Sequence, residues 1–319
     1  MDEIQYVKAW ESEIKLIYDQ FPKVKFVLTG SLSLSYKRRM EESLAGRFLP
    51  KYLYPLDFTE YLDFIDHPLY SKFQSEPDLI DQKILAASTS NDFNNFLYTG
   101  RYPETIKMTS KDCKYYLNTL QFQCLNQDTL NYFKIDRLNL LQNLFDYFKA
   151  NNGCETSFAK LSQIVGGSQE TISKYVDVLH LLRLIYIVQN TNNPLKTTNS
   201  NKKIYTNSAF SLNSDFVSKI DNLGQAAESY VLEKMLQNDE NISYFRQRNE
   251  EIDFISWSKN FKGQKGLGVE VKYRQKIKAD DYKNLVKICT KLSLQPKLIT
   301  INATEVADSS IITKPIIFL

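Results

Sequence analysis

Two short apolar runs near the end of the chain carry charged side chains, and this combination restricts the fold more than any other feature of the sequence. The run Ile252–Trp257 contains Asp253, and the run Leu267–Tyr273 contains Glu270 and Lys272. Residues two apart in a β-strand share a face, so Glu270 and Lys272 are expected to project together while the alternating apolar residues pack on the other face. If the two strands pair, Asp253 meets Glu270.

A helix predicted over residues 222–237 brings a third carboxylate, Glu228, to this region. Carboxylates on adjacent strands and a nearby helix form the oxygen-rich environment that Mg²⁺ prefers. Asp253, Glu270 and Glu228 are therefore the predicted metal ligands of a catalytic site. Lys272 is predicted to orient water or to stabilise the charge of a reacting phosphodiester. The alternative is a solvated strand face, because an acid and a Glu-x-Lys pair often occur by chance.

Basic residues near these strands are candidates for nucleic-acid contacts. Arg246 and Arg248 precede the acidic strand, and Lys283 and Lys287 recur at helical spacing in a helix predicted over residues 280–292. Arginine and lysine bind phosphate oxygens, so these residues are predicted to hold a DNA backbone. The net charge of +3 permits a nucleic-acid partner without requiring one. A solvated helix face is the alternative for the two lysines.

Residues 155–190 show a pattern typical of a helix-turn-helix. A Gly-Gly turn separates two short amphipathic helices, and Ser168 caps the second. Predicted strands at Leu184–Val188 and Lys203–Tyr205 would complete a winged helix. Lys174 on the second helix is then expected to contact DNA. Packing between domains is the alternative, because few basic residues flank this helix.

The first part of the chain alternates short strands and helices. A helix predicted over residues 7–19 is followed by a strand at Lys23–Thr29 and by an extended run at Phe48–Leu53. Asp57 then caps a short helix that has Glu60 in its first turn. This alternation predicts an open α/β sheet.

Three polar motifs near the start of the chain resemble parts of a nucleotide-binding site. Asp2 and Glu3 look like the end of a Walker B strand, whose acids hold Mg²⁺ and polarise the attacking water of an NTPase. Ser31 looks like a sensor residue that touches the γ-phosphate. Arg47 is an arginine of the kind that contacts a phosphate. Each of these motifs alone is a weak signal.

Taken in order, the motifs resemble the prokaryotic AAA-type (STAND-like) predicted ATPases that carry a C-terminal domain of restriction-endonuclease, PD-(D/E)XK, type. The segments that carry the resemblance are DEIQ, LTGS, ESLAGR, PLDFTE, GRYPE, EIDF and EVKY. Arg101 and Tyr102 depart from the GGFPE segment of this family. The resemblance implies Mg²⁺ at the nuclease-like site, and it implies nucleotide contacts for Asp2, Glu3 and Ser31.

The sequence contains no GxxxxGK[ST] P-loop, which this family places before its Walker B strand. Backbone amides and the lysine of that loop hold the β- and γ-phosphates. We therefore expect an N-terminally truncated member that hydrolyses no ATP by itself and binds ATP only if the missing loop is supplied. Strand edges left uncovered would favour pairing with a protein partner or with the missing N-terminal segment.

The motifs and the element pattern together predict four parts. Residues 1–66 form the remainder of the ATPase domain, 67–150 a helical connector, 151–206 a winged helix and 207–319 a restriction-endonuclease-like domain. The predicted fold class is α/β, and the predicted function is that of an ATPase-family protein with a metal-dependent nuclease-like domain acting on DNA. The alternative is an ATP-switched DNA- or protein-binding regulator whose nuclease fold is catalytically silent.

The content of cysteine, histidine and apolar residues argues against disulfide-rich, zinc-binding and membrane-spanning proteins. The four cysteines form no CxxC pair and only two histidines are present, so neither a disulfide framework nor a structural zinc site is expected. A reducing cytoplasm fits this cysteine usage. No apolar run approaches the ~18 residues that indicate a membrane span, so no membrane association is predicted.

Overall fold

The structure is a computed structural model. It describes every residue except 3, 5, 6, 8, 22, 31–48, 50, 76, 77, 100, 130–132, 134, 192–200, 213–221, 239, 240, 258–265, 275 and 303–305. Glu3, Ser31 and Arg47, which were predicted to contact a nucleotide, lie outside the described residues.

Helices and strands are distributed over the whole described chain. The helices are α1 (Trp10–Gln20), α3 (Phe58–Phe64), α4 (Tyr70–Gln74), α5 (Leu79–Ser88), α6 (Ser90–Tyr98), α7 (Ser110–Gln123), α9 (Leu138–Ala150), α10 (Phe158–Val165), α11 (Gln169–Leu181), α12 (Ser208–Ser211), α13 (Asn222–Asn238) and α14 (Asp280–Leu292). The strands are β1 (Glu155–Thr156), β2 (Ile185–Asn190), β3 (Lys202–Thr206), β4 (Ile242–Gln247), β5 (Glu250–Ser256), β6 (Leu267–Lys272), β7 (Gln295–Thr300) and β8 (Ile312–Pro315). Short turns of 3₁₀-helix at Pro103–Thr105 and Ile316–Phe318 and a π-helical turn at Cys124–Asp128 complete the set.

Within the described residues, eight strands form one mixed sheet in the order β1-β3-β2-β4-β5-β6-β7-β8. β4, β5 and β6 are antiparallel neighbours, whereas β6, β7 and β8 run parallel. A short parallel contact between β2 and β4 joins the hairpin β2–β3 to the rest of the sheet. The predicted α/β class is thus confirmed, and the sheet continues across the boundary expected at residue 206.

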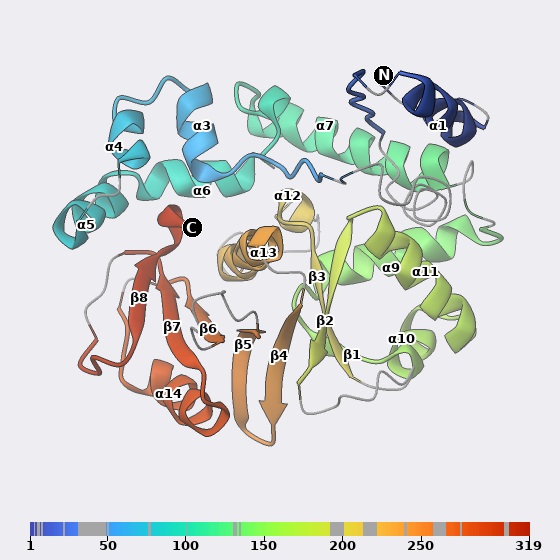
Figure 1. Ribbon diagram of the computed structural model, residues 1–319. Helices are drawn as coiled ribbons and strands as arrows, with labels where there is room; N and C mark the ends of the chain where they lie inside the picture. Colours follow the sequence, from blue (N-terminus) through green and yellow to red (C-terminus); the bar gives the residue numbers. More distant parts are fainter. Residues whose placement is uncertain are drawn as a thin grey trace.

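Helices cover both faces of this sheet. On one face, Tyr205, Tyr244 and Val271 belong to a buried core shared with α13, α6 and α3. On the other face, α14 packs against β5, β6 and β7. A separate core lies between β2–β3 and helices α9, α10 and α11. Figure 1 shows α14 near β7 and β8 at one end of the sheet and α9–α11 beside β1–β3 at the other.

The helix pair α10–α11 leads directly into the hairpin β2–β3. Ser168 caps α11 because its Oγ accepts the backbone N–H of Thr171 at 3.1 Å. β2 and β3, the two strands predicted after the helix pair, pair in antiparallel fashion. The buried side chains of α10 are Phe158 and Leu161, whereas Ile164 next to the end of the helix is 49% exposed.

The sequence predicted a regular strand at Lys23–Thr29, and this prediction is wrong. The segment bonds to the first residues of the chain: the Met1 ammonium donates to the Val27 carbonyl at 2.9 Å, and the Thr29 N–H donates to the Met1 carbonyl at 3.0 Å. A third bond runs from the Ile4 N–H to the Thr29 carbonyl at 3.1 Å. Within the described residues, these few bonds on one side do not make a ladder. Residues 49 and 51–53 of the second predicted run also form no strand.

The predicted cap of α3 is confirmed. The Glu60 N–H donates to Asp57 Oδ1 at 2.8 Å, and the Asp57 N–H donates to Glu60 Oε2 at 2.8 Å. The two side chains therefore satisfy two backbone groups reciprocally, which is the capping box that this spacing predicts.

Arg101 lies fully buried where the segment before α3 meets α13. Its Nε donates to the Leu56 carbonyl at 2.7 Å, and its Nη1 bonds to the carboxylate of Glu233 and to the hydroxyl of Ser208. The backbone φ of Arg101 is +62°. A left-handed backbone conformation favours glycine. Glycine therefore suits this position in the GGFPE segment of the family that the sequence resembles. The arginine side chain ties the segment before α3 to α12 and α13.

The strand β5 contains a bulge next to Asp253. Ser243 pairs with Ile255 and Phe245 pairs with Ile252, so two residues of β5 lie opposite one residue of β4. A bulge bends its strand and redirects side chains. Ile252 and Ile255 consequently both belong to the core under α14, whereas Phe254 belongs to the core under α13.

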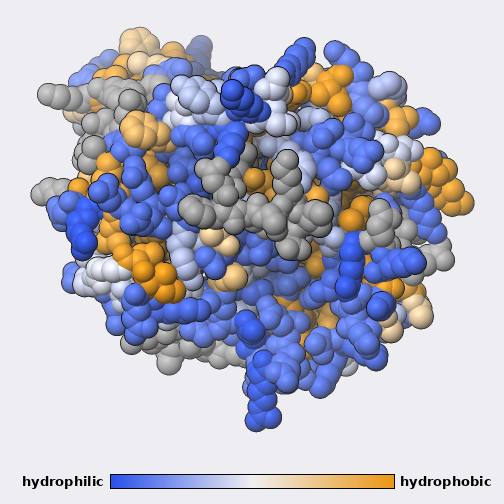
Figure 2. All heavy atoms as spheres, turned by 180° about the vertical axis from the view of Figure 1, so that it is seen from behind, coloured by the Kyte–Doolittle hydropathy of each residue, from blue (hydrophilic) through white to orange (hydrophobic). Residues whose placement is uncertain are grey.

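Apolar side chains are distributed unevenly over the surface. Hydrophilic residues cover most of the face seen in Figure 2, with small apolar groups scattered among them. In the N-terminal segment, Val27, Leu49 and Leu53 are 75%, 78% and 101% exposed. None of the helices in the described ranges is both long and apolar enough to span a membrane.

Candidate metal centre

Glu228 reaches the sheet from α13. Ala226, Ala227 and Tyr230 are buried and fix one side of this helix against the core. The Tyr205 hydroxyl on β3 donates a hydrogen bond to Glu228 Oε2 at 3.4 Å. The helix predicted from the sequence therefore brings this carboxylate next to Tyr205, on the face of the sheet that α13 covers.

Asp253 lies at the bulge of β5, where β5 and β6 stop pairing. The last Cα pair of this ladder is Phe254 with Val269, and beyond it Asp253 Oδ2 accepts the backbone N–H of Val271 at 2.9 Å. The carboxylate thus closes the gap between the two strands. It is 8% exposed, so its orientation is fixed by burial as well as by this bond.

Glu270 and Lys272 project together from β6, as their spacing predicted. Lys272 Nζ lies 2.5 Å from Glu270 Oε1. Glu270 Oε2 is buried and has no hydrogen-bond partner among the described residues. A buried carboxylate oxygen without a partner is unusual, since nearly all buried polar atoms in native structures are hydrogen-bonded or bind an ion or water. Val269 and Val271 pack on the opposite side, as expected.

The charges of these groups are coupled. Burial, and after it the nearby Asp253 carboxylate, raises the pKa of both Glu228 and Glu270 to about 8. Burial alone would lower the pKa of Lys272, but the carboxylates of Glu270 and Asp253 outweigh burial and raise it above its ordinary value. Glu228, Asp253, Glu270 and Lys272 thus influence one another electrostatically. Such mutual perturbation is typical of functional sites.

Sequence reasoning missed three side chains that belong to this cluster. Lys203 on β3 contacts Glu251 Oε1 at 2.6 Å and lies 3.9 Å from Asp253 Oδ1, and Tyr205 bonds to Glu228. The two-residue spacing of side chains in a strand could have indicated them. Lys203 and Tyr205 share one face of β3, and Glu251 is two residues from Asp253. What the sequence did not show was that β3 joins the same sheet.

The metal-binding geometry itself is not preformed. Within the part of the chain that the structure describes, no group of three or more His, Cys, Asp or Glu residues is arranged to hold a metal ion. Lysine ammonium groups take the positions of counter-ions instead, with Lys272 on Glu270 and Lys203 beside Asp253. Asp2, the metal ligand predicted for the nucleotide site, accepts a hydrogen bond from the Thr29 hydroxyl.

The basic residues predicted to bind DNA lie on the surface around the sheet. Arg246 contacts Glu251 Oε2 at 3.4 Å, so it reaches the rim of the carboxylate cluster. Arg248 occupies the turn between β4 and β5. Lys283 and Lys287 on α14 pair with Asp280 and Glu250, each at 2.5 Å. Exposed ion pairs are weak, so these pairs add little to the stability of the fold.

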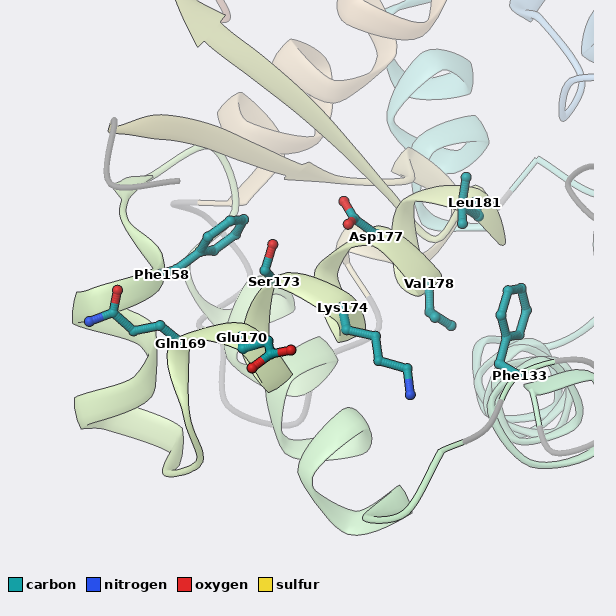
Figure 3. A pocket seen from close by; sticks show the side chains of 9 residues that line it. All are labelled: Phe133, Phe158, Gln169, Glu170, Ser173, Lys174, Asp177, Val178 and Leu181. Atoms are coloured by element: carbon teal, nitrogen blue, oxygen red, sulfur yellow. The ribbon is translucent and has the colours of Figure 1, made fainter. Parts of the chain in front are cut away.

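Lys174 lines a cavity of about 580 Å³ along α11. Figure 3 shows Lys174 and Val178 on the side of α11 that faces Phe133, with Phe158 at the other end. The other lining residues are Gln169, Glu170, Ser173, Asp177 and Leu181. Acidic groups accompany the lysine here, so charge alone does not single out this helix as a DNA-binding surface.

Three family models match successive parts of the chain. Residues 1–62 match an AAA domain, residues 90–213 a domain of unknown function (DUF8612) and residues 223–316 a second domain of unknown function (DUF4143). The first and third matches support an AAA-like ATPase-family protein. The third match covers α13 and the strands that carry Asp253 and Glu270.

Similar curated proteins come from an archaeon and a bacterium. Uncharacterized protein MJ1544 of Methanocaldococcus jannaschii is 24% identical over 274 residues, which cover 81% of this chain and 58% of that protein. An uncharacterized protein of Haemophilus influenzae is 22% identical over 191 residues, covering 58% of this chain and 44% of that protein. The chain thus spans about half the length of these relatives. No solved structure gives a significant match to this chain.

Proposed function

We propose that Glu228, Asp253, Glu270 and Lys272 form the centre of a metal-dependent nuclease of PD-(D/E)XK type that acts on DNA. The observation that carries this proposal is Glu270 Oε2, a buried carboxylate oxygen without a hydrogen-bond partner among the described residues, in a side chain whose pKa is raised by burial and by the Asp253 and Glu228 carboxylates. Three mutually interacting carboxylates with one open oxygen suit a hard divalent cation such as Mg²⁺.

Each residue of the cluster has a distinct part in this proposal. Asp253, Glu270 and Glu228 would hold Mg²⁺, which supplies polarisation of the phosphodiester and a more acidic bound water. Lys272, already held by Glu270, supplies a positive charge next to the reacting phosphate. Val271 orients Asp253 through its N–H.

The remaining parts of the chain supply substrate contacts and control. The helix pair α10–α11 with hairpin β2–β3 is the proposed winged helix, and Arg246 and Arg248 are the proposed phosphate contacts near the site. For residues 1–62, the match to an AAA domain supports nucleotide binding through Asp2, Glu3, Ser31 and Arg47 when a P-loop is supplied.

A catalytically silent regulator is the second candidate. It is favoured by the counter-ion positions of Lys203 and Lys272 and by the absence, among the described residues, of a preformed group of metal ligands. In that case the same fold serves as a binding module, and the carboxylate cluster only stabilises the junction of β5 and β6.

Plasmid cleavage by the purified full chain separates the two candidates. With Mg²⁺, the wild-type protein is expected to nick or linearise DNA, and both Asp253→Asn and Glu270→Gln are expected to lose at least about 100-fold in rate. EDTA should abolish the activity. The matched control is Asp308→Asn, which removes a carboxylate in an exposed loop bonded to Ser310. Equal rates for the wild type and Asp253→Asn would refute the nuclease proposal.

A further inference from the structure

Lys203 enters the carboxylate cluster from outside the strands that carry the predicted ligands. It lies on β3, in the hairpin that follows the α10–α11 helices, and its side chain is 6% exposed. Its ammonium group lies 2.6 Å from Glu251 Oε1 and 3.9 Å from Asp253 Oδ1, and 5.4 Å from the centre of the Tyr244 ring. A buried lysine is expensive unless it is paired, so this position is specified by the acids around it.

The two oxygens of Asp253 have different surroundings. Oδ2 accepts the Val271 N–H, which fixes the carboxylate, whereas Oδ1 faces the Lys203 ammonium group. A divalent cation bound at Oδ1 would therefore stand close to a positive charge in a buried, low-dielectric environment. Like charges repel strongly there.

We propose that Lys203 is a built-in counter-ion that competes with the divalent metal for Asp253. The inference rests on the proposed metal site and specifies its regulation: the metal occupies Asp253 fully only when the ammonium group moves away from Asp253. Lys203 is a positioning residue in this scheme. It sets the metal concentration at which the site fills.

The position of Lys203 is coupled to the helix pair through β3 itself. The neighbouring Lys202 points to the other side of the strand, where its Nζ lies 3.4 Å from the centre of the Phe158 ring on α10. Ile204 is buried in the core shared with α9, α10 and α11. A displacement of the α10–α11 helices therefore moves β3 and shifts the balance between the lysine and the metal.

Metal titrations of thermal unfolding test the proposal without relying on cleavage. In the full chain, Lys203→Met should lower the melting temperature without metal, because Glu251 and Asp253 lose their counter-ion. The same variant should bind Mg²⁺ or Mn²⁺ about tenfold more tightly, which corresponds to ~1.4 kcal/mol of binding free energy. The metal-induced rise in melting temperature reports this affinity.

Two control variants separate competition from loss of packing. Lys203→Arg keeps the charge and should bind the metal within about twofold of the wild type. Lys202→Met removes a neighbouring buried lysine on the opposite side of β3, so it should lower stability while leaving the metal affinity unchanged. A purely structural role of Lys203 predicts weaker or unchanged metal binding in Lys203→Met, and that result would overturn the proposal.

The outcomes also distinguish this inference from the proposed function. If the wild type binds the metal and Asp253→Asn abolishes binding, the metal site stands, and an unchanged affinity in Lys203→Met refutes the competition alone. If neither the wild type nor Lys203→Met binds the metal, the metal site itself is wrong.

A labelling experiment on the wild-type protein covers the case in which Lys203→Met does not fold. Amine modification followed by mass spectrometry should show faster labelling of Lys203 with Mg²⁺ than without it, whereas labelling of Lys202 should not change. Labelling of Lys203 that is independent of the metal would contradict the proposal.

Discussion

The N-terminal segment and the C-terminal sheet of this chain bury their apolar residues to very different extents. Among the described residues up to 30, the core consists of Ile4, Trp10 and Ile14 with Phe26 and Leu28 packed against it. The sheet β4–β8 instead has helices on both faces. The comparison shows that similar alternating patterns give a regular strand only where neighbouring elements complete the ladder and cover its faces.

The largest effect is expected at Arg101, which joins the segment before α3 to α12 and to α13, the helix that covers the sheet. Arg101→Met leaves Glu233 buried without its counter-ion and frees the carbonyl of Leu56. Breaking a buried ion pair typically costs about 3–5 kcal/mol, and urea unfolding would measure that loss.

A double variant provides the control for this effect. Arg101→Met combined with Glu233→Met removes both charges and should recover a large part of the loss. A double variant as unstable as the sum of the single variants would show that Arg101 acts through packing and not through the ion pair.

The second prediction concerns pH and the carboxylates of the sheet. The pKa of Glu228 and of Glu270 is about 8 in the folded protein, above the ordinary value of 4.5. The folded protein therefore keeps protons that the unfolded chain has lost. The two protonated carboxyl groups contribute fully to the free energy of unfolding below about pH 4.5. This contribution is lost as pH rises toward about 8, at about 1.4 kcal/mol per pH unit for one such carboxyl.

Thermal unfolding between pH 5.5 and 7.5 measures this slope. Glu270→Gln stays neutral throughout and should reduce the slope, and Mg²⁺ should restore stability most at the upper end of the range. A melting temperature that is flat over this range in the wild type would contradict the raised pKa values.

A third prediction probes packing between β6 and α14. A Cβ added at Gly268 would approach Cys289 Sγ to 2.4 Å, so Gly268→Ala should destabilise the protein by about 1–3 kcal/mol. The matched control is Gly224→Ala at the start of α13, where no atom lies within 4 Å of the added Cβ. That variant should be neutral or slightly stabilising in the same urea titration, because alanine is the better helix former.

The smallest effect is expected in the N-terminal segment. Val27→Ser, Leu49→Ser and Leu53→Ser replace exposed apolar side chains, so each should change the free energy of unfolding by less than about 0.5 kcal/mol. Solubility should rise, as measured by light scattering against concentration, because less apolar surface is exposed. A loss of several kcal/mol would show that these residues are covered in the working protein.

Local patterns in the sequence were sufficient for some elements and for part of the site. The helix predicted over residues 280–292 matches α14, and the capping of α3 by Asp57 follows from spacing alone. The shared face of Glu270 and Lys272 follows from strand periodicity. These features depend on residues that are close in the sequence.

Other features depend on partners far along the chain and were not predicted. Strand β8 was missed because its short run acquires strand structure only by pairing with β7. The buried environment of Arg101 arises from residues more than 100 positions away, Ser208 and Glu233. Lys203 joins the site only because β2 pairs with β4.

Because of the bulge in β5, the number of residues in this strand decides which of its side chains face each core. Two residues, Asp253 and Phe254, lie opposite the single Tyr244, so the alternation of side chains changes phase at this point. Deleting either residue would bring the strand back into phase and turn Ile252 out of the core beneath α14. When related chains are aligned, an insertion or gap here should therefore mark loss of the site more reliably than most substitutions.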